Sequence, residues 1–271
     1  MIPLFVDSLL TVTPRCVREM GYLREAVGIR RRWKHCSTHW AEHVRYCRAI
    51  ILKAAERCYD KRRVVILGGG LMHDIPLDEL CAMFGEVVLA DIVHPVSSRL
   101  LTRRYKNLKR MTLDVTGVME RVFQIGWERD KPLPLSRPGF LLDGDAPDLT
   151  VSLNLASQLP CMPIAWLKKW KARNDGELDR FARQVIDAHM QWLKEIPGVV
   201  CLVTDTSKLK YDLLGRLAEE TPILYGSPLP LPDDNWIWKL APAPEVDAKF
   251  SYYRRVSGYI NWKPHRLLPG V

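Results

Sequence analysis

The sequence has no apolar run long enough to cross a membrane, and no basic stretch precedes the apolar residues near its amino terminus. A spanning helix needs about 20 consecutive apolar residues, and a secretory signal begins with a basic region. The sequence therefore predicts neither a membrane span nor an export signal. Its seven cysteines are an odd number with no regular spacing and no CxxC pair. Such cysteines are typical of reduced thiols, so we expect a cytoplasmic protein.

The composition also lacks the extremes that mark disordered or fibrous chains. Hydrophobic residues make up 47% and charged residues 26% of the 271 positions, which is ordinary for a globular protein. A chain of this length can bury a substantial core. We therefore expect one enzyme-sized domain with an added segment.

Positive charge is concentrated near the amino terminus. Residues 1–63 contain 14 Lys or Arg and 6 Asp or Glu, a balance of +8 out of the total of +9. Between Pro14 and Arg63 there is no further proline, and apolar residues recur at steps of three and four, which predicts a long amphipathic helix. We predict a helical extension over residues 1–60 and a catalytic domain over residues 61–271. A basic helix favours an anionic substrate or a nucleic acid, although a solvated helical face is the simpler explanation.

Histidines and cysteines recur within this predicted helix. Cys36, His39, His43 and Cys47 follow one another at steps of three, four and four, so they share a helix face. At a rise of 1.5 Å per residue, Cys36 and Cys47 lie roughly 16 Å apart, too far for both to bind one ion. An adjacent pair alone would need further ligands that the sequence does not identify. We predict no metal site and expect this face to pack against the rest of the protein.

The most informative segment is an apolar run at residues 64–67 that Gly68, Gly69 and Gly70 follow directly. A short β-branched apolar run is typical of a strand buried on both faces. Three glycines then permit a tight turn close to a ligand, although a glycine turn between buried elements can also be purely structural.

A second apolar run, at residues 87–90, ends at Asp91. Asp74 and Pro76 are start signals for a helix over residues 76–84 between the two runs. In a right-handed parallel unit the Asp91 carboxylate then lies beside the glycine turn, where it can accept the paired hydroxyls of a ribose. The order of strand, glycines, helix, strand and acid predicts a site for a nucleoside cofactor.

Two common nucleotide motifs are absent around these glycines. No Gly-Lys-Ser or Gly-Lys-Thr follows them, which excludes a Walker phosphate loop. The third glycine of the dinucleotide pattern GxGxxG is needed for close helix packing, and His73 stands in its place. A nicotinamide cofactor is therefore disfavoured.

With these features, the chain resembles the class I S-adenosylmethionine-dependent methyltransferases over most of residues 60–261. The segment "NLKRMTLDVTG" resembles the third strand of that family, "APDLTVSLNLASQLP" the fourth and "GVVCLVTDTSK" the fifth. The segments "DNWIWKL" and "YYRRVSGYINW" resemble the closing antiparallel pair. The resemblance implies a Rossmann-like doubly wound α/β sheet, mostly parallel with a C-terminal antiparallel strand pair. It also implies S-adenosyl-L-methionine as the cofactor.

The resemblance further implies roles for particular residues. Asp114 corresponds to the acid near the adenine amino group, and Val115 offers a backbone N–H beside it. The family's acid two residues before the first glycine is Ile66 here, and the third glycine of GxGxG is Met72. Asp74 is our candidate to hold the cofactor's ammonium group instead, with a helix cap as the equally good alternative. The candidate cofactor-binding residues are Gly68, Gly69, Gly70, Asp74, Asp91, Ile92, Asp114, Val115 and Asn154.

The loop after the fourth predicted strand carries the candidate catalytic residues. Asn154 and Gln158 have amides that can orient a substrate group toward the transferred methyl. Family members that methylate amino groups often have two prolines and an aromatic residue here, whereas this chain has "NLAS", so an exocyclic base amine is disfavoured. Methyl transfer is a direct displacement that alignment alone can accelerate. Where a base is needed, Asp205, His94 and Tyr211 are candidates, each with an ordinary structural alternative.

These observations together predict an S-adenosylmethionine-dependent methyltransferase that acts by direct displacement, with a small-molecule acceptor favoured. Two alternatives are an NAD(P)-dependent oxidoreductase and a noncatalytic nucleic-acid-binding protein that retains a methyltransferase-like fold. Nucleic acid would then bind the basic N-terminal helix. The sequence carries no specific pattern for the acceptor or for an oligomeric state.

Overall fold

The computed structural model describes residues 9–139, 146–171 and 173–263. Strands lie at β1 (Arg63–Leu67), β2 (Glu86–Asp91), β3 (Leu108–Thr112), β4 (Leu149–Leu153), β5 (Val199–Asp212), β6 (Leu217–Pro222), β7 (Asp234–Ala241) and β8 (Phe250–Tyr259). Helices lie at α2 (Arg15–Glu19), α3 (Tyr22–Glu56), α4 (Leu77–Met83), α5 (Val96–Thr102), α6 (Met119–Ile125), α7 (Cys161–Lys169) and α8 (Asp175–Glu195), with a 3₁₀ turn η1 (Ala156–Gln158).

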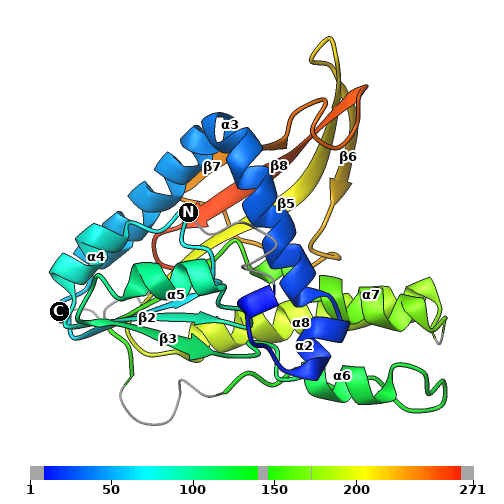
Figure 1. Ribbon diagram of the computed structural model, residues 1–271, viewed down its shortest axis with the longest axis horizontal. Coiled ribbons are helices and arrows are strands. Elements are labelled where there is room, and N and C mark those ends of the chain that lie inside the picture. Colours follow the sequence, from blue (N-terminus) through cyan, green and yellow to red (C-terminus); the bar gives the residue numbers. More distant parts are fainter. Residues whose placement is uncertain (1–8, 140–145, 172, 264–271) are drawn as a thin grey trace, which may run out of the picture.

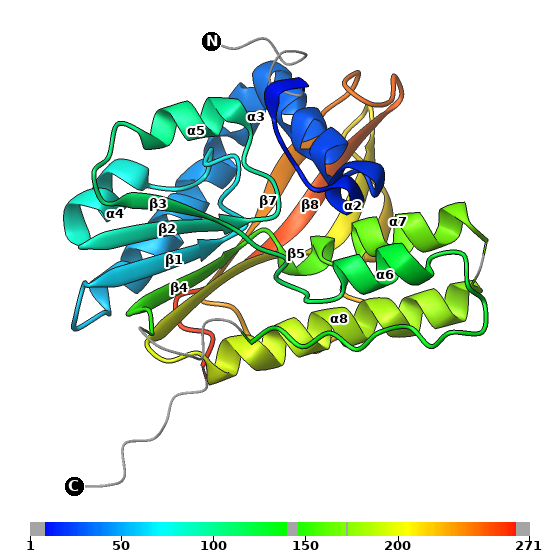
Figure 2. The ribbon, with the colours of Figure 1, turned by 60° about the horizontal axis from the view of Figure 1, so that its bottom comes forward.

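The strands form one twisted sheet that helices cover on both faces (Figures 1 and 2). Its order is β3-β2-β1-β4-β5-β8-β7, and β6 pairs with the far end of β5. The pairs from β3 to β5 are parallel, whereas β8 runs antiparallel to both β5 and β7. This confirms the predicted Rossmann-like doubly wound sheet with a C-terminal antiparallel pair, which is the fold of the class I methyltransferases.

The central strands divide the core into two layers because successive side chains point to opposite faces. Val64 and Ile66 of β1 pack in the cluster formed with α3, α4 and β7. Val65 and Leu67 pack in the other cluster, with α2, α6, α7 and α8. All four side chains are at most 1% exposed. Since β1 is covered on both faces, its uninterrupted apolar run was a reliable strand signal.

The long helix α3 confirms the predicted amphipathic helix before the first strand. It begins after Gly21, whose positive φ of 96° separates it from α2. Its buried face packs against β7, β5 and β4 within the same hydrophobic cluster as β1. No described helix is long and apolar enough to span a bilayer. The division at residue 60 stays a prediction.

The crossover helix α8 has apolar residues at helical spacing and a helix-start signal before its first residue. Asn174 accepts a hydrogen bond from the Glu177 backbone N–H (2.9 Å), and the Glu177 side chain accepts from the Asn174 backbone N–H (3.1 Å). This capping box satisfies two donors that a helix start leaves open. Pro197 and Gly198 follow its end and lead into β5.

The sequence analysis missed β6 and ended the fifth strand too early, at Lys208. The six residues of β6 are all exposed, so no alternation of apolar and polar residues marks it. β5 continues to Asp212 because its far end pairs with β6 and β8 rather than with β4. Residues 131–139 and 146–147, between α6 and β4, form neither helix nor strand.

His189 of α8 gives a pH-dependent contribution to stability. It is 1% exposed, its Nε2 lies 2.9 Å from the Ser152 hydroxyl, and burial lowers its pKa to about 3. An unfolded histidine titrates near pH 6.5. Below this pH, His189 therefore binds a proton in the unfolded chain but stays neutral in the folded protein. The stabilisation is complete above about pH 6.5 and falls by roughly 1.4 kcal/mol per pH unit toward pH 4.

Denaturant unfolding at pH 7, 6 and 5 tests this for the natural protein and His189→Gln. The natural protein should lose unfolding free energy more steeply with acidification, because the variant has no histidine to protonate on unfolding. Parallel curves for the two proteins would contradict the assignment.

Candidate functional site

The predicted site residues gather at the edge of the sheet where the parallel strands end. Leu67, the last residue of β1, lies in register with Ala90 of β2 and with Ser152 of β4. The segments that follow, which begin at Gly68, Asp91 and Asn154, therefore leave the sheet side by side. In doubly wound sheets, ligands bind at this edge.

The glycine turn is tightly enclosed by neighbouring backbone. Gly68 has a positive φ of 86°, and a Cβ there would lie 2.7 Å from the Leu153 carbonyl oxygen. A Cβ on Gly70 would lie 2.5 Å from the Val93 carbonyl oxygen and 2.7 Å from Asp91 Oδ2. Both positions exclude any larger residue, because backbone atoms cannot move aside as a flexible side chain can.

Asp91 lies beside this turn, as the sequence predicts. Its Oδ2 accepts a hydrogen bond from the Gly70 backbone N–H (2.8 Å) and its Oδ1 from the Val93 N–H (3.3 Å). Each oxygen accepts one of these bonds and so retains acceptor capacity for a ligand hydroxyl. Burial raises the pKa of Asp91, against the backbone bonds that lower it. Ile92, a further predicted contact, packs at the edge of the core.

Asp114 lies at the neighbouring strand end, where the Leu113 N–H donates to the Asp91 carbonyl (3.0 Å). Its Oδ1 accepts from the backbone N–H (2.9 Å) and hydroxyl (2.5 Å) of Thr116, and its Oδ2 accepts from the Met119 N–H (2.9 Å). The carboxylate thus organises the start of α6, and its free acceptor capacity is mainly on Oδ2. Val115 beside it is buried.

Asp74 and Asn154 are brought together from two loops. The Asn154 Nδ2 donates to Asp74 Oδ2 at 2.7 Å. Asp74 does not cap α4, whose N-cap is Pro76 without a side-chain bond, so the helix-cap alternative is wrong. Asn154 has a positive φ of 49°, and its Oδ1 is buried with no hydrogen-bond partner among the described residues. Asn154 thus turns its amide nitrogen, and not its oxygen, toward the Asp74 carboxylate.

The sequence analysis missed His43 and Cys47 of α3 as members of this site. His43 Nε2 lies 3.2 Å from Asn154 Nδ2 and 3.4 Å from Cys47 Sγ. Both side chains are at most 2% exposed. Burial lowers the pKa of His43 to about 3 and raises that of Cys47, so both are uncharged near neutral pH. Their spacing on a buried helix face was visible in the sequence, but only the fold shows that this face meets the loop after β4.

Atoms of His43, Cys47 and Asp74 lie within 4.8 Å of one another, a set that can hold a metal ion. The Trp236 indole N–H donates to His43 Nδ1 at 3.0 Å. An indole nitrogen can only donate, so His43 Nδ1 accepts from Trp236. His43 Nε2 faces the Asn154 amide nitrogen at 3.2 Å, so an N–H group lies against each ring nitrogen.

The remaining catalytic candidates are engaged elsewhere. The Gln158 Nε2 donates to the Asn154 carbonyl (2.7 Å), so it supports the loop rather than facing the cofactor side. Asp205 accepts from the Ser157 hydroxyl and pairs with Arg254 Nε at 3.3 Å. Burial raises the pKa of Asp205, against the effects of Ser157 and Arg254.

Of the other two candidate bases, His94 lies near enough to Asp91 to lower the pKa of that carboxylate, whereas Tyr211 lies far from the site. His94 Nε2 contacts the Met111 carbonyl oxygen (2.9 Å), and burial lowers its pKa. Tyr211 pairs with Ser251 at the far end of β5. It lies eight residues beyond Val203, the last β5 residue paired with β4, which is about 26 Å along the strand.

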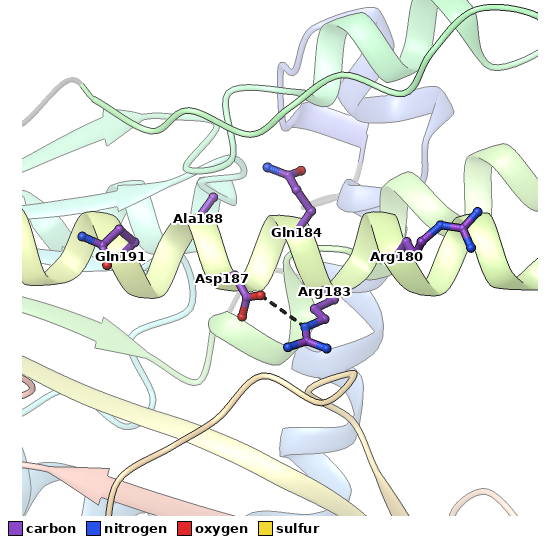
Figure 3. Close-up of a pocket in the computed structure, with 6 residues that line it drawn as sticks. All are labelled: Arg180, Arg183, Gln184, Asp187, Ala188 and Gln191. Atoms are coloured by element: carbon purple, nitrogen blue, oxygen red, sulfur yellow. Dashed lines mark hydrogen bonds and ion pairs between the residues drawn. The ribbon is translucent and has the colours of Figure 1, made fainter.

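A depression of about 450 Å³ lies elsewhere, on the outer side of α8 (Figure 3). Arg183 and Asp187 form an ion pair at its rim with a separation of 3.4 Å. None of the predicted site residues lines it. This surface feature is separate from the strand ends.

Comparison with known proteins gives distant structural likenesses only. No family model and no curated protein matches the sequence. A DhpI-SAM-HEP complex is 13% identical at a TM-score of 0.36, over 90% of this chain and 99% of that one. The Burkholderia thailandensis 1,6-didemethyltoxoflavin-N1-methyltransferase with bound 1,6-didemethyltoxoflavin and S-adenosylhomocysteine is 12% identical at 0.31, over 87% and 89%. A Leishmania major SAM-dependent methyltransferase is 11% identical at 0.29, over 81% and 83%. The fold assignment rests on the strand order of this chain.

The glycine turn makes a direct prediction for stability. Gly70→Ala should lower the unfolding free energy by about 1–3 kcal/mol, because its new methyl group meets the Val93 carbonyl and the Asp91 carboxylate. Gly28→Ala in α3 is the matched control, since nothing lies within 4 Å of a Cβ there. It should be neutral or stabilising by up to about 1 kcal/mol. Thermal unfolding measures both, and an unchanged Gly70→Ala melting temperature would contradict the geometry.

Proposed function

We propose that the protein is an S-adenosylmethionine-dependent methyltransferase that transfers the methyl group by direct displacement to a small molecule. The observation that carries this proposal is the pair of carboxylates on the two sides of one glycine turn. Asp91 bonds to Gly70 within the turn, and Asp74 follows it to meet Asn154. This arrangement offers one acid to each end of an adenosyl amino acid.

The nucleoside end of such a cofactor fits the residues at β2 and β3. The two oxygens of Asp91 each keep acceptor capacity for one hydroxyl of a ribose. Asp114 follows the adjacent strand, and its Oδ2 can accept one more donor, such as an adenine amino group. Ile92 and Val115 supply the apolar surface next to these acids.

The amino acid end fits the group at Asp74 and Asn154. A cationic ammonium group needs an acceptor, and the Asp74 carboxylate, which already accepts from Asn154, can supply one. Asp74 would thus replace the acid that Ile66 does not provide. An ammonium group would also offset the burial that raises the pKa of Asp74.

The packing of α3 beside the site favours a small acceptor over a nucleic acid. Trp33 of α3 stacks on His73, with ring centroids 4.3 Å apart and an angle of 10°. Arg30, one turn earlier, is only 8% exposed. Arg30 and Trp33 are therefore packed against the protein, whereas other basic residues of α3, such as Arg31 and Lys34, are exposed. A displacement reaction in such a site gains chiefly from aligning nucleophile and methyl group.

Isothermal calorimetry with S-adenosylhomocysteine tests the cofactor site. The natural protein should bind it, and Asp91→Ala should weaken binding by about 1.5–3 kcal/mol through the loss of charge-assisted hydrogen bonds. Glu195→Gln changes an exposed residue at the end of α8, so it removes a charge without touching the site and should bind like the natural protein. Absence of binding by the folded natural protein would refute the proposal.

The Asp74→Asn variant tests whether Asp74 binds the amino acid end of the cofactor or its nucleoside end. It should weaken S-adenosylhomocysteine binding at least tenfold, because an amide does not balance the ammonium charge, a difference of about 1.4 kcal/mol. Binding of 5′-methylthioadenosine, which lacks the amino acid part, should be unchanged. Equal losses for both ligands would place Asp74 at the nucleoside end or in a structural role.

A further inference from the structure

An ion pair of arginine and aspartate lies immediately beyond the proposed cofactor site. Arg254 Nε of β8 lies 3.3 Å from Asp205 Oδ2 of β5, and these side chains are 18% and 5% exposed. Ser157, in the turn after β4, donates its hydroxyl to Asp205 Oδ1. Arg254 Nη1 also donates to the Tyr253 carbonyl (3.1 Å). The guanidinium group is therefore held at two points, and its Nη2 donates to no described residue.

A second guanidinium group approaches this pair from α3. The helix packs across β5 and β8 (Figure 1), and its Arg32 has a buried Nε with no hydrogen-bond partner among the described residues. Burial lowers the pKa of Arg254, the Asp205 carboxylate raises it, and the Arg32 charge lowers it again. The two guanidinium groups are therefore close enough to repel each other. Like charges and unpaired buried donors both cost free energy, and an anion bound beside them would remove both costs.

The charges of this group select the kind of anion. Arg32 and Arg254 are two cations beside one carboxylate, that of Asp205, so one positive charge lacks a counter-ion within the group. Two further charged residues nearby, Lys208 and Glu25, are exposed and opposite in sign. A guanidinium group can bind a carboxylate through two parallel N–H groups. One ligand carboxylate would balance the remaining charge, whereas a phosphate dianion would exceed it.

The position of this group relative to the cofactor residues fits an acceptor site. In the sheet order β3-β2-β1-β4-β5-β8, the proposed nucleoside residues follow β2 and β3, and those for the amino acid end follow β1 and β4. Asp205 lies just beyond Val203, the last β5 residue paired with β4, and Arg254 comes from the next strand. A carboxylate bound there would lie beside the proposed cofactor site without using its residues.

We propose that Arg254 and Arg32 bind a carboxylate group of the methyl acceptor, and that Asp205 is a positioning residue that orients Arg254. The acceptor is accordingly a small carboxylic acid. The repulsion between the two guanidinium groups is offset when this substrate binds. Its role as acceptor rests on the proposed function, whereas the binding of a carboxylate does not.

The test measures the affinity of the protein for benzoate by isothermal calorimetry without cofactor, with uncharged benzamide and inorganic phosphate as comparison ligands. The natural protein should bind benzoate at least tenfold more tightly than benzamide, because only the carboxylate can accept charge-assisted hydrogen bonds from the arginines. It should also prefer benzoate to phosphate. Equal binding of benzoate and benzamide, or tighter binding of phosphate, would overturn the proposal without any variant.

Two variants assign the binding to these arginines. Arg254→Gln and Arg32→Gln should each weaken benzoate binding at least tenfold. Arg31→Gln is the matched control, since Arg31 is exposed on the same helix and carries the same charge, and it should bind benzoate like the natural protein. Arg32→Gln should unfold at no lower temperature than the natural protein, because the buried Nε has no hydrogen bond to lose. An equal loss of affinity in Arg31→Gln, or a marked loss of stability in Arg32→Gln, would overturn the assignment.

S-adenosylhomocysteine separates the carboxylate site from the proposed function. If both hold, it should bind together with benzoate, because the two ligands use different residues. Competition between them would show that the arginines hold the carboxylate of the cofactor itself, and would overturn the acceptor role. Binding of benzoate without binding of S-adenosylhomocysteine would refute the proposed function and leave the carboxylate site standing. Absence of benzoate binding alone would refute only the carboxylate site.

Discussion

The close approach of backbone segments at the ends of β1, β2 and β4 is the constraint on which the rest of the site depends. Gly68 passes within contact distance of the Leu153 carbonyl, and Gly70 lies against the Val93 carbonyl and Asp91. Because no side chain fits there, the three loops leave the sheet packed against one another. Asp91 is held in this packing by two backbone N–H groups rather than by a cation. Its oxygens therefore remain directed at the sheet edge with acceptor capacity for a ligand.

A second set of contacts joins this edge to the helix that precedes the sheet. Trp236 of β7 contacts His43 of α3, which lies against Asn154 after β4, and Asn154 donates to Asp74. Four segments far apart in the sequence thus meet through one chain of polar contacts inside an otherwise apolar layer. Buried polar groups of this kind need partners, which makes their arrangement specific. Within this chain of contacts, Asn154 Oδ1 has no hydrogen-bond partner among the described residues.

Elements with strong local signals were predictable, and those defined by distant partners were not. β4 lies at Leu149–Leu153 as predicted because it is buried on both faces. α8 was predictable from its Asn174 cap and the periodicity of its apolar residues. β6 was not predicted because all its residues are exposed, so its sequence has no alternation of apolar and polar residues. Asp205 was expected to be a free candidate base, yet Ser157 and Arg254 engage it. Partners such as Arg254 come from a strand about 50 residues later, which no local pattern reveals.

The amino-acid sequence alone determined the strand-glycine-helix-strand unit, the parallel order of the first strands and the position of Asp91, because these follow from local hydrophobic periodicity and the handedness of parallel connections. Only the tertiary structure decided what the side chains beside that unit do. The fold shows that Asp74 accepts a hydrogen bond from Asn154 rather than capping a helix. It also shows that the α3 face with His43 and Cys47 is part of the site. It also placed the indole N–H of Trp236, from β7 near the other end of the chain, against His43 Nδ1. Protonation and hydrogen bonding depend on what lies within about 3 Å in space, and the sequence specifies that distance only through the completed fold.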